Sequence, residues 1–317
     1  MPLWQAIILG AVQGLTEFLP ISSTAHLALV PWMFGWRDPG LTFDVALHVG
    51  TLAAVLIYFR QTWFDLIVAS LHPATGRRAA ASAANSANSS SVDGVDNLVN
   101  LEAAVHSTRR NSGPKSASPG ASGTDARLLW LLVLGTIPAA VIGLLFEKQV
   151  ETTLRSPFVM GVTLIPVALL MAYADQLGSG SKNLAALGLR DALVVGCSQA
   201  IALIPGVSRS GITMTAGLFM RLQRDAAARF SFLLSTPIIA GACMKKLLDV
   251  YNEGLAPEMV APFAAGAAVS AVVGYATIAF FIRFLQFGTF RIFVYYRIVI
   301  GIIVLALATY YRLNLNP

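Results

Sequence analysis

The stretch Pro205-Gly-Val-Ser-Arg-Ser-Gly-Ile-Thr213 places one arginine, three hydroxyl side chains and two glycines inside a long apolar region. Apolar residues run before it over 192–204 and after it over 212–220. A charged guanidinium at membrane depth costs at least about 2.5–3.5 kcal/mol unless it faces a cavity or a partner. Backbone N–H groups beside glycine, together with hydroxyls and a fixed cation, suit a bound phosphate. The simpler alternative is a broken helix whose polar residues only satisfy the backbone groups freed around Pro205.

The composition excludes a soluble globular protein. Of the 317 residues, 56% are hydrophobic and only 12% are charged, and the mean hydropathy is +0.68. Soluble domains carry about 25% charged residues. The basic residues are scattered over loops, so the net charge of +6 does not indicate a nucleic-acid partner. The two cysteines, Cys197 and Cys243, lie in apolar segments and imply neither a disulfide framework nor a metal-binding CxxC.

Apolar runs of bilayer length predict six full membrane spans, at 41–59, 128–146, 157–174, 230–243, 261–282 and 292–307. The segment 72–126 is rich in Ser, Ala, Asn and Gly, and we expect it to be a disordered loop. A polar turn is expected at 147–156 and a basic connection at 221–229. The N-terminus has no basic region before its apolar run, so we expect it to be mature sequence rather than a signal peptide.

Two regions interrupt this pattern in the same way. Gly10-x-x-Gln13 precedes Pro20 and Ser22-Ser23, and Gly196-x-x-Gln199 precedes Pro205 and Ser208-Arg209-Ser210. Half-length apolar arms around a polar, proline-bearing centre are typical of re-entrant hairpins, which need protein or water to cover their backbone. Three predicted spans separate the two copies, so their topologies should be inverted, as is common in transporters.

The sequence therefore predicts an all-α polytopic membrane protein, with about six transmembrane helices and two re-entrant helical hairpins arranged as an inverted repeat. We expect one integral membrane domain over 1–317. Its first repeat covers about 1–71 and 127–146, the loop insert about 72–126, and the second repeat about 157–317.

The distribution of Lys and Arg predicts the orientation of this domain. Segments 60–127, 175–190, 221–229 and 283–297 fall on one side and hold 15 basic residues. The opposite side holds six, namely Arg37, Lys148, Arg155, Lys245, Lys246 and Arg312. Because cytoplasmic loops carry the excess of Lys and Arg, the first side should be cytoplasmic and both termini should lie outside.

Polar residues at membrane depth form the candidate site. Glu17 lies one helical turn after Gln13, and it is a candidate metal ligand, general base or partner of Arg209. A purely structural Glu17–Arg209 ion pair is the alternative. Ser23 and His26 are three residues apart and would share a helix face, so they are candidates for nucleophile and base, and His26 could instead attack phosphorus itself.

The remaining polar residues suit phosphate binding. Arg209 offers a planar fork for bidentate contact, and further donors would come from the neighbouring hydroxyls and amide of Gln13, Ser22, Ser208, Ser210 and Thr213. His48 is expected to cap or line the first span, with a role in the site as the alternative. The set as a whole indicates phosphoryl transfer at a membrane surface, where positioning and charge neutralisation carry most of the catalysis. No Walker loop is present, so nothing suggests ATP.

The residues Gln13-x-x-x-Glu17, Pro20-Ile-Ser-Ser-Thr-Ala-His26 and the 205–213 motif resemble the bacterial undecaprenyl-diphosphate phosphatases, the bacitracin-resistance family. The segment Ala226-Ala-Arg-Phe-Ser-Phe-Leu-Leu-Ser235 is similar to the family as well. The resemblance covers nearly the whole chain apart from 72–126. The chain departs from the family at Gln13, where many members have Glu, and in its long loop.

The resemblance implies hydrolysis of undecaprenyl diphosphate to the monophosphate and inorganic phosphate, which recycles a lipid carrier for cell-wall glycan synthesis and confers bacitracin resistance. It implies a divalent cation, Mg²⁺ or Ca²⁺, with Glu17 as a ligand, and a multi-pass protein of the bacterial inner membrane whose site faces the periplasm or exterior. The functional residues it carries over are Glu17, Ser23, His26, Ser208, Arg209, Ser210 and Thr213.

The expected partners are a polyprenyl diphosphate lipid and the bilayer, with a homodimer as a candidate assembly and no nucleic acid. The main rival is a transporter or flippase of polyprenyl phosphate lipid, which the repeat supports. A flippase would need Arg209 but would tolerate loss of a nucleophile. A structural membrane scaffold, the third alternative, explains none of the buried polar residues.

Overall fold

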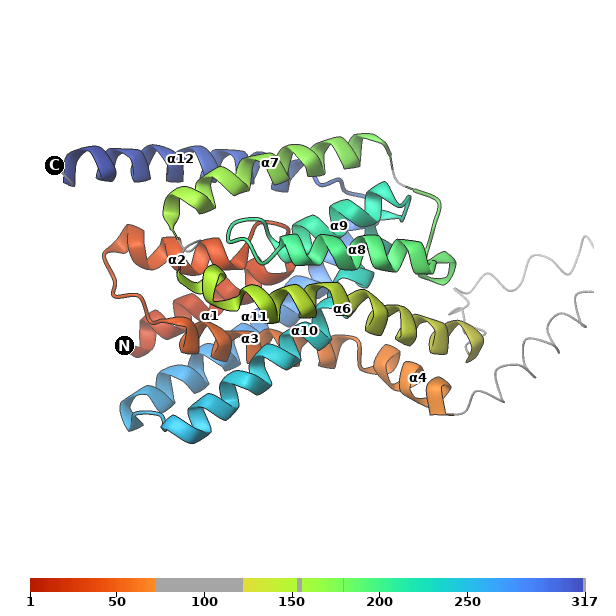
Figure 1. Ribbon diagram of the computed structural model, residues 1–317, viewed down its shortest axis with the longest axis horizontal. Helices are drawn as coiled ribbons and strands as arrows, with labels where there is room; N and C mark the ends of the chain where they lie inside the picture. Colours follow the sequence, from red (N-terminus) through yellow and green to blue (C-terminus); the bar gives the residue numbers. More distant parts are fainter. Residues whose placement is uncertain (72–121, 153–155, 179, 316–317) are drawn as a thin grey trace, which may run out of the picture. The chain divides into compact units, whose positions relative to one another are not determined.

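The computed structural model describes residues 1–71, 122–152, 156–178 and 180–315. Within these ranges the chain forms eleven α-helices and one 3-10 helix, η1 (Leu184–Ala186), with no β-strand (Figure 1). Its contacts divide it into two units, one of Met1–Arg60 with Trp130–Pro317 and the other of Gln61–Leu129. The described part of the second unit holds most of α4 (Arg60–Leu71) and the first turns of α6. The first unit contains everything discussed below.

Six helices are long and apolar enough to cross a membrane. They are α3 (Leu41–Tyr58), α6 (Ser122–Thr152), α7 (Pro157–Gln176), α10 (Arg224–Glu253), α11 (Pro257–Leu285) and α12 (Arg291–Leu315). At about 1.5 Å per residue, the shortest of these still approaches the roughly 30 Å thickness of a bilayer core. The predicted number of spans and the all-α, multi-pass class are therefore confirmed.

Four shorter helices form two broken pairs where the sequence predicts interruptions. The first pair is α1 (Leu3–Phe18) and α2 (Ser23–Phe34), and the second is α8 (Leu189–Ile201) and α9 (Arg209–Phe219). The members have 16, 12, 13 and 11 residues, so each is shorter than the roughly 20 residues of a full crossing. Both pairs are compatible with re-entrant hairpins, and their position in a membrane stays a prediction.

The two pairs share local geometry at their breaks. Ser22 and Ser208 both adopt positive φ, 77° and 73°, a region that residues other than glycine enter rarely. Each serine caps the following helix, because its side chain accepts a hydrogen bond from the backbone N–H three residues on, that of Ala25 or Gly211. The breaks therefore aim two helix N-termini into the protein. The inverted relation between the pairs remains a prediction.

Glycines allow each first arm to approach a long helix at backbone distance. A Cβ at Gly10 of α1 would lie 2.5 Å from the carbonyl oxygen of Gly266 in α11, and one at Gly196 of α8 would lie 2.1 Å from that of Gly135 in α6. Helix α11 also packs along α3, and α7 packs along α12, as Figure 1 shows. The long helices thus form a frame around the two broken pairs.

Several predicted boundaries need correction. Helix α10 begins at Arg224, so most of the expected basic connection is helical. Arg224 is held there by the buried carboxylate of Asp175, 2.6 Å away. Helix α6 continues to Thr152, through much of the expected polar turn. Arg297, which the charge count assigned to a loop, lies inside α12 and is fully buried. The predicted loop over 72–126 falls almost entirely outside the described residues.

Candidate active site

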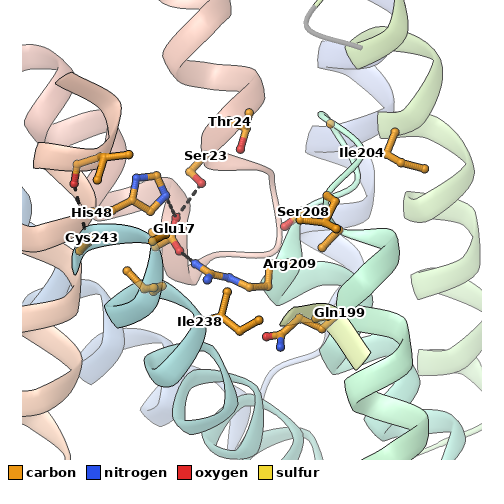
Figure 2. A pocket seen from close by; sticks show the side chains of 17 residues that line it. Glu17, Ser23, Thr24, His48, Gln199, Ile204, Ser208, Arg209, Ile238 and Cys243 are labelled. Carbon is orange, nitrogen blue, oxygen red and sulfur yellow. Dashed lines mark hydrogen bonds and ion pairs between the residues drawn. The ribbon is translucent and has the colours of Figure 1, made fainter. Parts of the chain in front are cut away.

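A cavity of about 200 Å³ lies where the two broken pairs meet α3, α6 and α10 (Figure 2). Its polar lining comes from the first pair through Glu17, Ser23 and Thr24, and from the second pair through Gln199, Ser208 and Arg209. Its apolar lining includes Val45, Ala139, Ala202, Leu203, Ile204, Ile238, Ile239 and Ala242. Two segments far apart in the sequence therefore build one site with a polar centre and an apolar wall.

The Glu17 carboxylate is the centre of this polar cluster. One of its oxygens pairs with the Arg209 guanidinium. The other accepts hydrogen bonds from the Ser23 hydroxyl at 2.7 Å and from the Gln13 amide at 3.1 Å. His48 Nε2 lies 3.5 Å from the same oxygen. The predicted pairing of Glu17 with Arg209 is thus present, and it is combined with a serine–carboxylate contact.

Ser23 and Arg209 occupy equivalent places, each the first residue of the second helix in its pair. The N-terminus of a helix leaves backbone N–H groups without intrahelical partners and carries a partial positive charge. Helices α2 and α9 therefore direct two such ends toward the cavity, and Arg209 adds a full charge. This arrangement favours an anion between them.

The predicted contact between Ser23 and His26 does not form. His26 Nδ1 lies 2.7 Å from the Ser22 carbonyl oxygen, which can only accept, and Nε2 lies 2.7 Å from the Tyr296 hydroxyl. The His26 ring also stacks on Tyr296, and it does not belong to the cavity lining. Ser23 and His26 do lie in one helix, as predicted, but the His26 side chain is hydrogen-bonded to Tyr296 of α12 instead.

Three predicted phosphate-binding hydroxyls are also engaged elsewhere. Ser22 caps α2, Ser210 donates to the Leu19 carbonyl at 3.1 Å, and Thr213 donates to the Arg209 carbonyl at 2.7 Å and meets Ser231 at 2.6 Å. All three are buried outside the lining. They hold the two breaks in shape, whereas Ser208 and Arg209 reach the cavity itself.

Two residues that are not among the predicted site residues, His48 and Gln199, lie in the site in the structure. His48 was expected to cap or line its span, with a role in the site only as the alternative, yet it faces Glu17 while its Nδ1 donates to the Asp44 carbonyl at 2.8 Å. Gln199 was noted only as the repeat counterpart of Gln13, and it lines the cavity. The repeat itself was the signal for Gln199, while nothing local in the sequence marks His48.

Arg297 fixes the two breaks relative to each other. Its side chain is 0% exposed, and it donates hydrogen bonds of 3.0–3.2 Å to the carbonyl oxygens of Pro20, Leu164, Gly206 and Val207. Pro20 belongs to the first break, and Gly206 and Val207 belong to the second. Backbone carbonyls without a partner in a helix need such donors when they lie at membrane depth. The Arg297 side chain supplies hydrogen-bond donors to carbonyls of both breaks.

The residues around Glu17 fit a hard divalent cation only with help from a ligand. The described residues hold no group of three or more His, Cys, Asp or Glu side chains placed to share a metal ion. Gln13 is fully buried and is not part of the cavity lining, but it contacts Glu17 through its amide nitrogen, and its side-chain oxygen has no hydrogen-bond partner. One carboxylate and one amide oxygen match the way Mg²⁺ binds through few protein ligands together with substrate phosphates and water.

Comparison with known proteins gives a consistent result over almost the whole chain. The family model for bacitracin resistance protein BacA matches residues 6–303. An undecaprenyl-diphosphatase from Pelotomaculum thermopropionicum is 42% identical over 97% of this chain and 97% of its own. Those from Moorella thermoacetica and Elusimicrobium minutum are 42% and 43% identical, over 96% of this chain in each case and over 98% and 97% of their own lengths.

The role of Arg297 can be tested by its substitution. Arg297→Met should lower the thermal unfolding midpoint in detergent markedly, because a buried carbonyl left without its donor costs about 1–3 kcal/mol. Arg297→Lys should fall between this variant and the parent, since lysine keeps the charge but cannot reach four carbonyls. Arg291→Met, an exposed change on the same helix, is the control. Equal midpoints for Arg297→Met and Arg291→Met would contradict the role.

Proposed function

The chain belongs to the bacitracin resistance protein BacA family, and on this basis we propose that it hydrolyses undecaprenyl diphosphate to undecaprenyl phosphate and inorganic phosphate. The observation that carries the proposal is the Ser23 hydroxyl, hydrogen-bonded to Glu17 in a cavity that Arg209 also lines. The reaction would regenerate the lipid carrier used for cell-wall glycan synthesis, and its loss would sensitise cells to bacitracin.

Ser23 is the nucleophile in this proposal. Glu17 accepts the hydroxyl proton while Ser23 Oγ bonds to the terminal phosphorus, and the bond from that phosphorus to the bridging oxygen breaks, which releases the lipid monophosphate. Glu17 passes this proton to the departing lipid monophosphate. A water molecule then attacks the phosphoserine and gives a proton to Glu17, which returns it to Ser23 Oγ as the bond to phosphorus breaks, so that inorganic phosphate leaves and Ser23 is regenerated. His26 is less suited to attack, because both of its ring nitrogens are engaged by Ser22 and Tyr296.

Arg209 and the two helix N-termini bind the diphosphate. In the transition state of phosphoryl transfer, negative charge is spread over the phosphoryl oxygens, and fixed donors beside these oxygens stabilise it. The incoming diphosphate competes with Glu17 for the Arg209 guanidinium. As Arg209 turns to phosphate, the carboxylate becomes available for the Ser23 proton. Ser208, at the cap of α9, adds a hydroxyl on the same side.

A divalent cation would be held by the Glu17 carboxylate and the Gln13 side-chain oxygen, with the phosphates as further ligands. When bound, it would neutralise phosphate charge and polarise the phosphoryl oxygens. The unpartnered oxygen of Gln13 supports this placement.

The apolar wall of the cavity suits the prenyl chain, and it includes Ala202, Leu203 and Ile204 after α8 and Ile238 and Ile239 of α10. A flippase that moves the lipid without hydrolysing it would also need this wall and Arg209. It would not need a serine hydroxyl hydrogen-bonded to a carboxylate, and that contact favours hydrolysis.

The orientation with the site toward the exterior rests on where the cavity residues lie in their spans. Val45 and His48 occupy the first half of α3, while Ala242 and Cys243 occupy the second half of α10. These are the halves next to Arg37 and next to Lys245 and Lys246, on the side with fewer basic residues. Under the positive-inside rule this side is the exterior.

The activity is tested by phosphate release from farnesyl diphosphate in detergent, with Mg²⁺ or with EDTA. We expect release that requires the cation, and a loss of about 10²–10⁴-fold in kcat for Glu17→Gln, the magnitude of a general base. Arg291→Met, an exposed change outside the cavity, would serve as a folding control with small effect. A folded protein that releases no phosphate from any prenyl diphosphate would exclude the proposal.

The nucleophile is identified by trapping. Rapid acid quench with substrate labelled in its terminal phosphate should leave label on Ser23, and Ser23→Ala should abolish both label and turnover. In a parallel quench with alkaline detergent, acid-labile label that survives in Ser23→Ala and disappears in His26→Ala would assign the attack to His26 instead.

The orientation is tested in cells by cysteine labelling. In a chain whose two native cysteines are replaced by serine, Arg37→Cys should react with a membrane-impermeant maleimide from outside. Arg283→Cys, at the opposite end of the spans, should react only after permeabilisation. The reverse pattern would place the cavity on the cytoplasmic side.

A further inference from the structure

Gln199 is a buried polar residue that the mechanism above leaves unused. Its side chain is 2% exposed, and neither its amide oxygen nor its amide nitrogen has a hydrogen-bond partner among the described residues. It lines the cavity from α8, and Figure 2 shows its amide on the side where Arg209 and Ile238 lie. A buried amide without a hydrogen-bond partner destabilises the protein. We therefore expect a ligand in the cavity to supply the partner of this amide.

Comparison with Gln13 indicates what kind of ligand. The Gln13 amide nitrogen donates to Glu17, four residues on in the same helix. The residue four positions after Gln199 is Leu203, which has no acceptor in its side chain. The second pair therefore repeats the amide donor of the first pair but omits the carboxylate. An anionic ligand near Arg209 would take the place of that missing acceptor.

The position of Gln199 in the cavity selects one of the two phosphates. The attacked terminal phosphate must lie against Ser23, which comes from the first pair. Gln199 belongs to the second pair, and the residues that follow it, Ala202, Leu203 and Ile204, are part of the apolar wall suited to the prenyl chain. The phosphate beside that wall is the one that carries the chain.

We propose that Gln199 binds the lipid-linked phosphate, the group that the product retains, by donating from its amide nitrogen. The proposal rests on the proposed function, because it assumes a prenyl diphosphate in the cavity. It assigns the two phosphates to the two pairs: the terminal phosphate to Ser23, Glu17 and the start of α2, and the lipid-linked phosphate to Gln199 and the start of α9. Arg209 lies between them.

The test separates the two phosphates by product inhibition. In Gln199→Leu, inhibition by farnesyl phosphate should weaken roughly tenfold or more, as expected for one hydrogen bond to a charged group. Inhibition by inorganic phosphate should stay within about twofold, since that product leaves from the Ser23 side. Gln199→Glu replaces the amide with an anionic group of the same size, so inhibition by farnesyl phosphate should be weaker still. Ser198→Ala, whose hydroxyl donates to the Val195 carbonyl, should change neither constant.

Unfolding midpoints distinguish this role from a structural one. Because leucine removes an unpaired buried amide, Gln199→Leu without ligand should be as stable as the parent or more stable. The shift in midpoint produced by farnesyl phosphate should shrink, and that measurement needs no turnover. Binding that is intact in Gln199→Leu, or inhibition by both products weakened equally, would overturn the proposal. A parent protein that binds farnesyl phosphate but releases none from the diphosphate would instead overturn the proposed function.

Discussion

Backbone carbonyls that leave a helix at membrane depth must find donors inside the protein, and this constraint governs the whole arrangement. The chain breaks two helical pairs inside an apolar frame, and it satisfies carbonyls of both breaks with the single side chain of Arg297. A lysine could not serve, because only the planar guanidinium spreads its donors widely enough. The two breaks are thereby held together, although nearly two hundred residues separate them in sequence.

Fixing the breaks places two helix N-termini and one carboxylate in contact. A buried carboxylate such as Glu17 would be costly without partners, and it is stabilised by Arg209, Ser23, Gln13 and His48 together. The same contacts order the side chains that we propose to be catalytic before any ligand arrives, which is the preorganisation that electrostatic catalysis needs. Stability and reactivity therefore depend on one cluster.

The two broken pairs differ in sequence at the positions to which the proposed mechanism gives different roles. Both pairs keep the close-packing glycine, the buried glutamine and the capping serine, all of which serve the backbone or the site geometry. Where the first pair has Glu17 and Ser23, the second has Leu203 and Arg209. In the proposed mechanism one half thus supplies a base and a nucleophile, and the other supplies a cation and an apolar wall.

The class, the six spans, the two interruptions and the motifs around Glu17 and Arg209 could be predicted from the sequence, because hydropathy and the placement of charged residues in apolar runs are local properties of the chain. Which polar groups contact one another could be seen only in the folded protein. There His26 is hydrogen-bonded to Tyr296, and Ser210 and Thr213 donate to backbone carbonyls. His48 and Gln199 line the cavity. Partners of this kind come from helices remote in sequence, and their choice depends on how those helices pack.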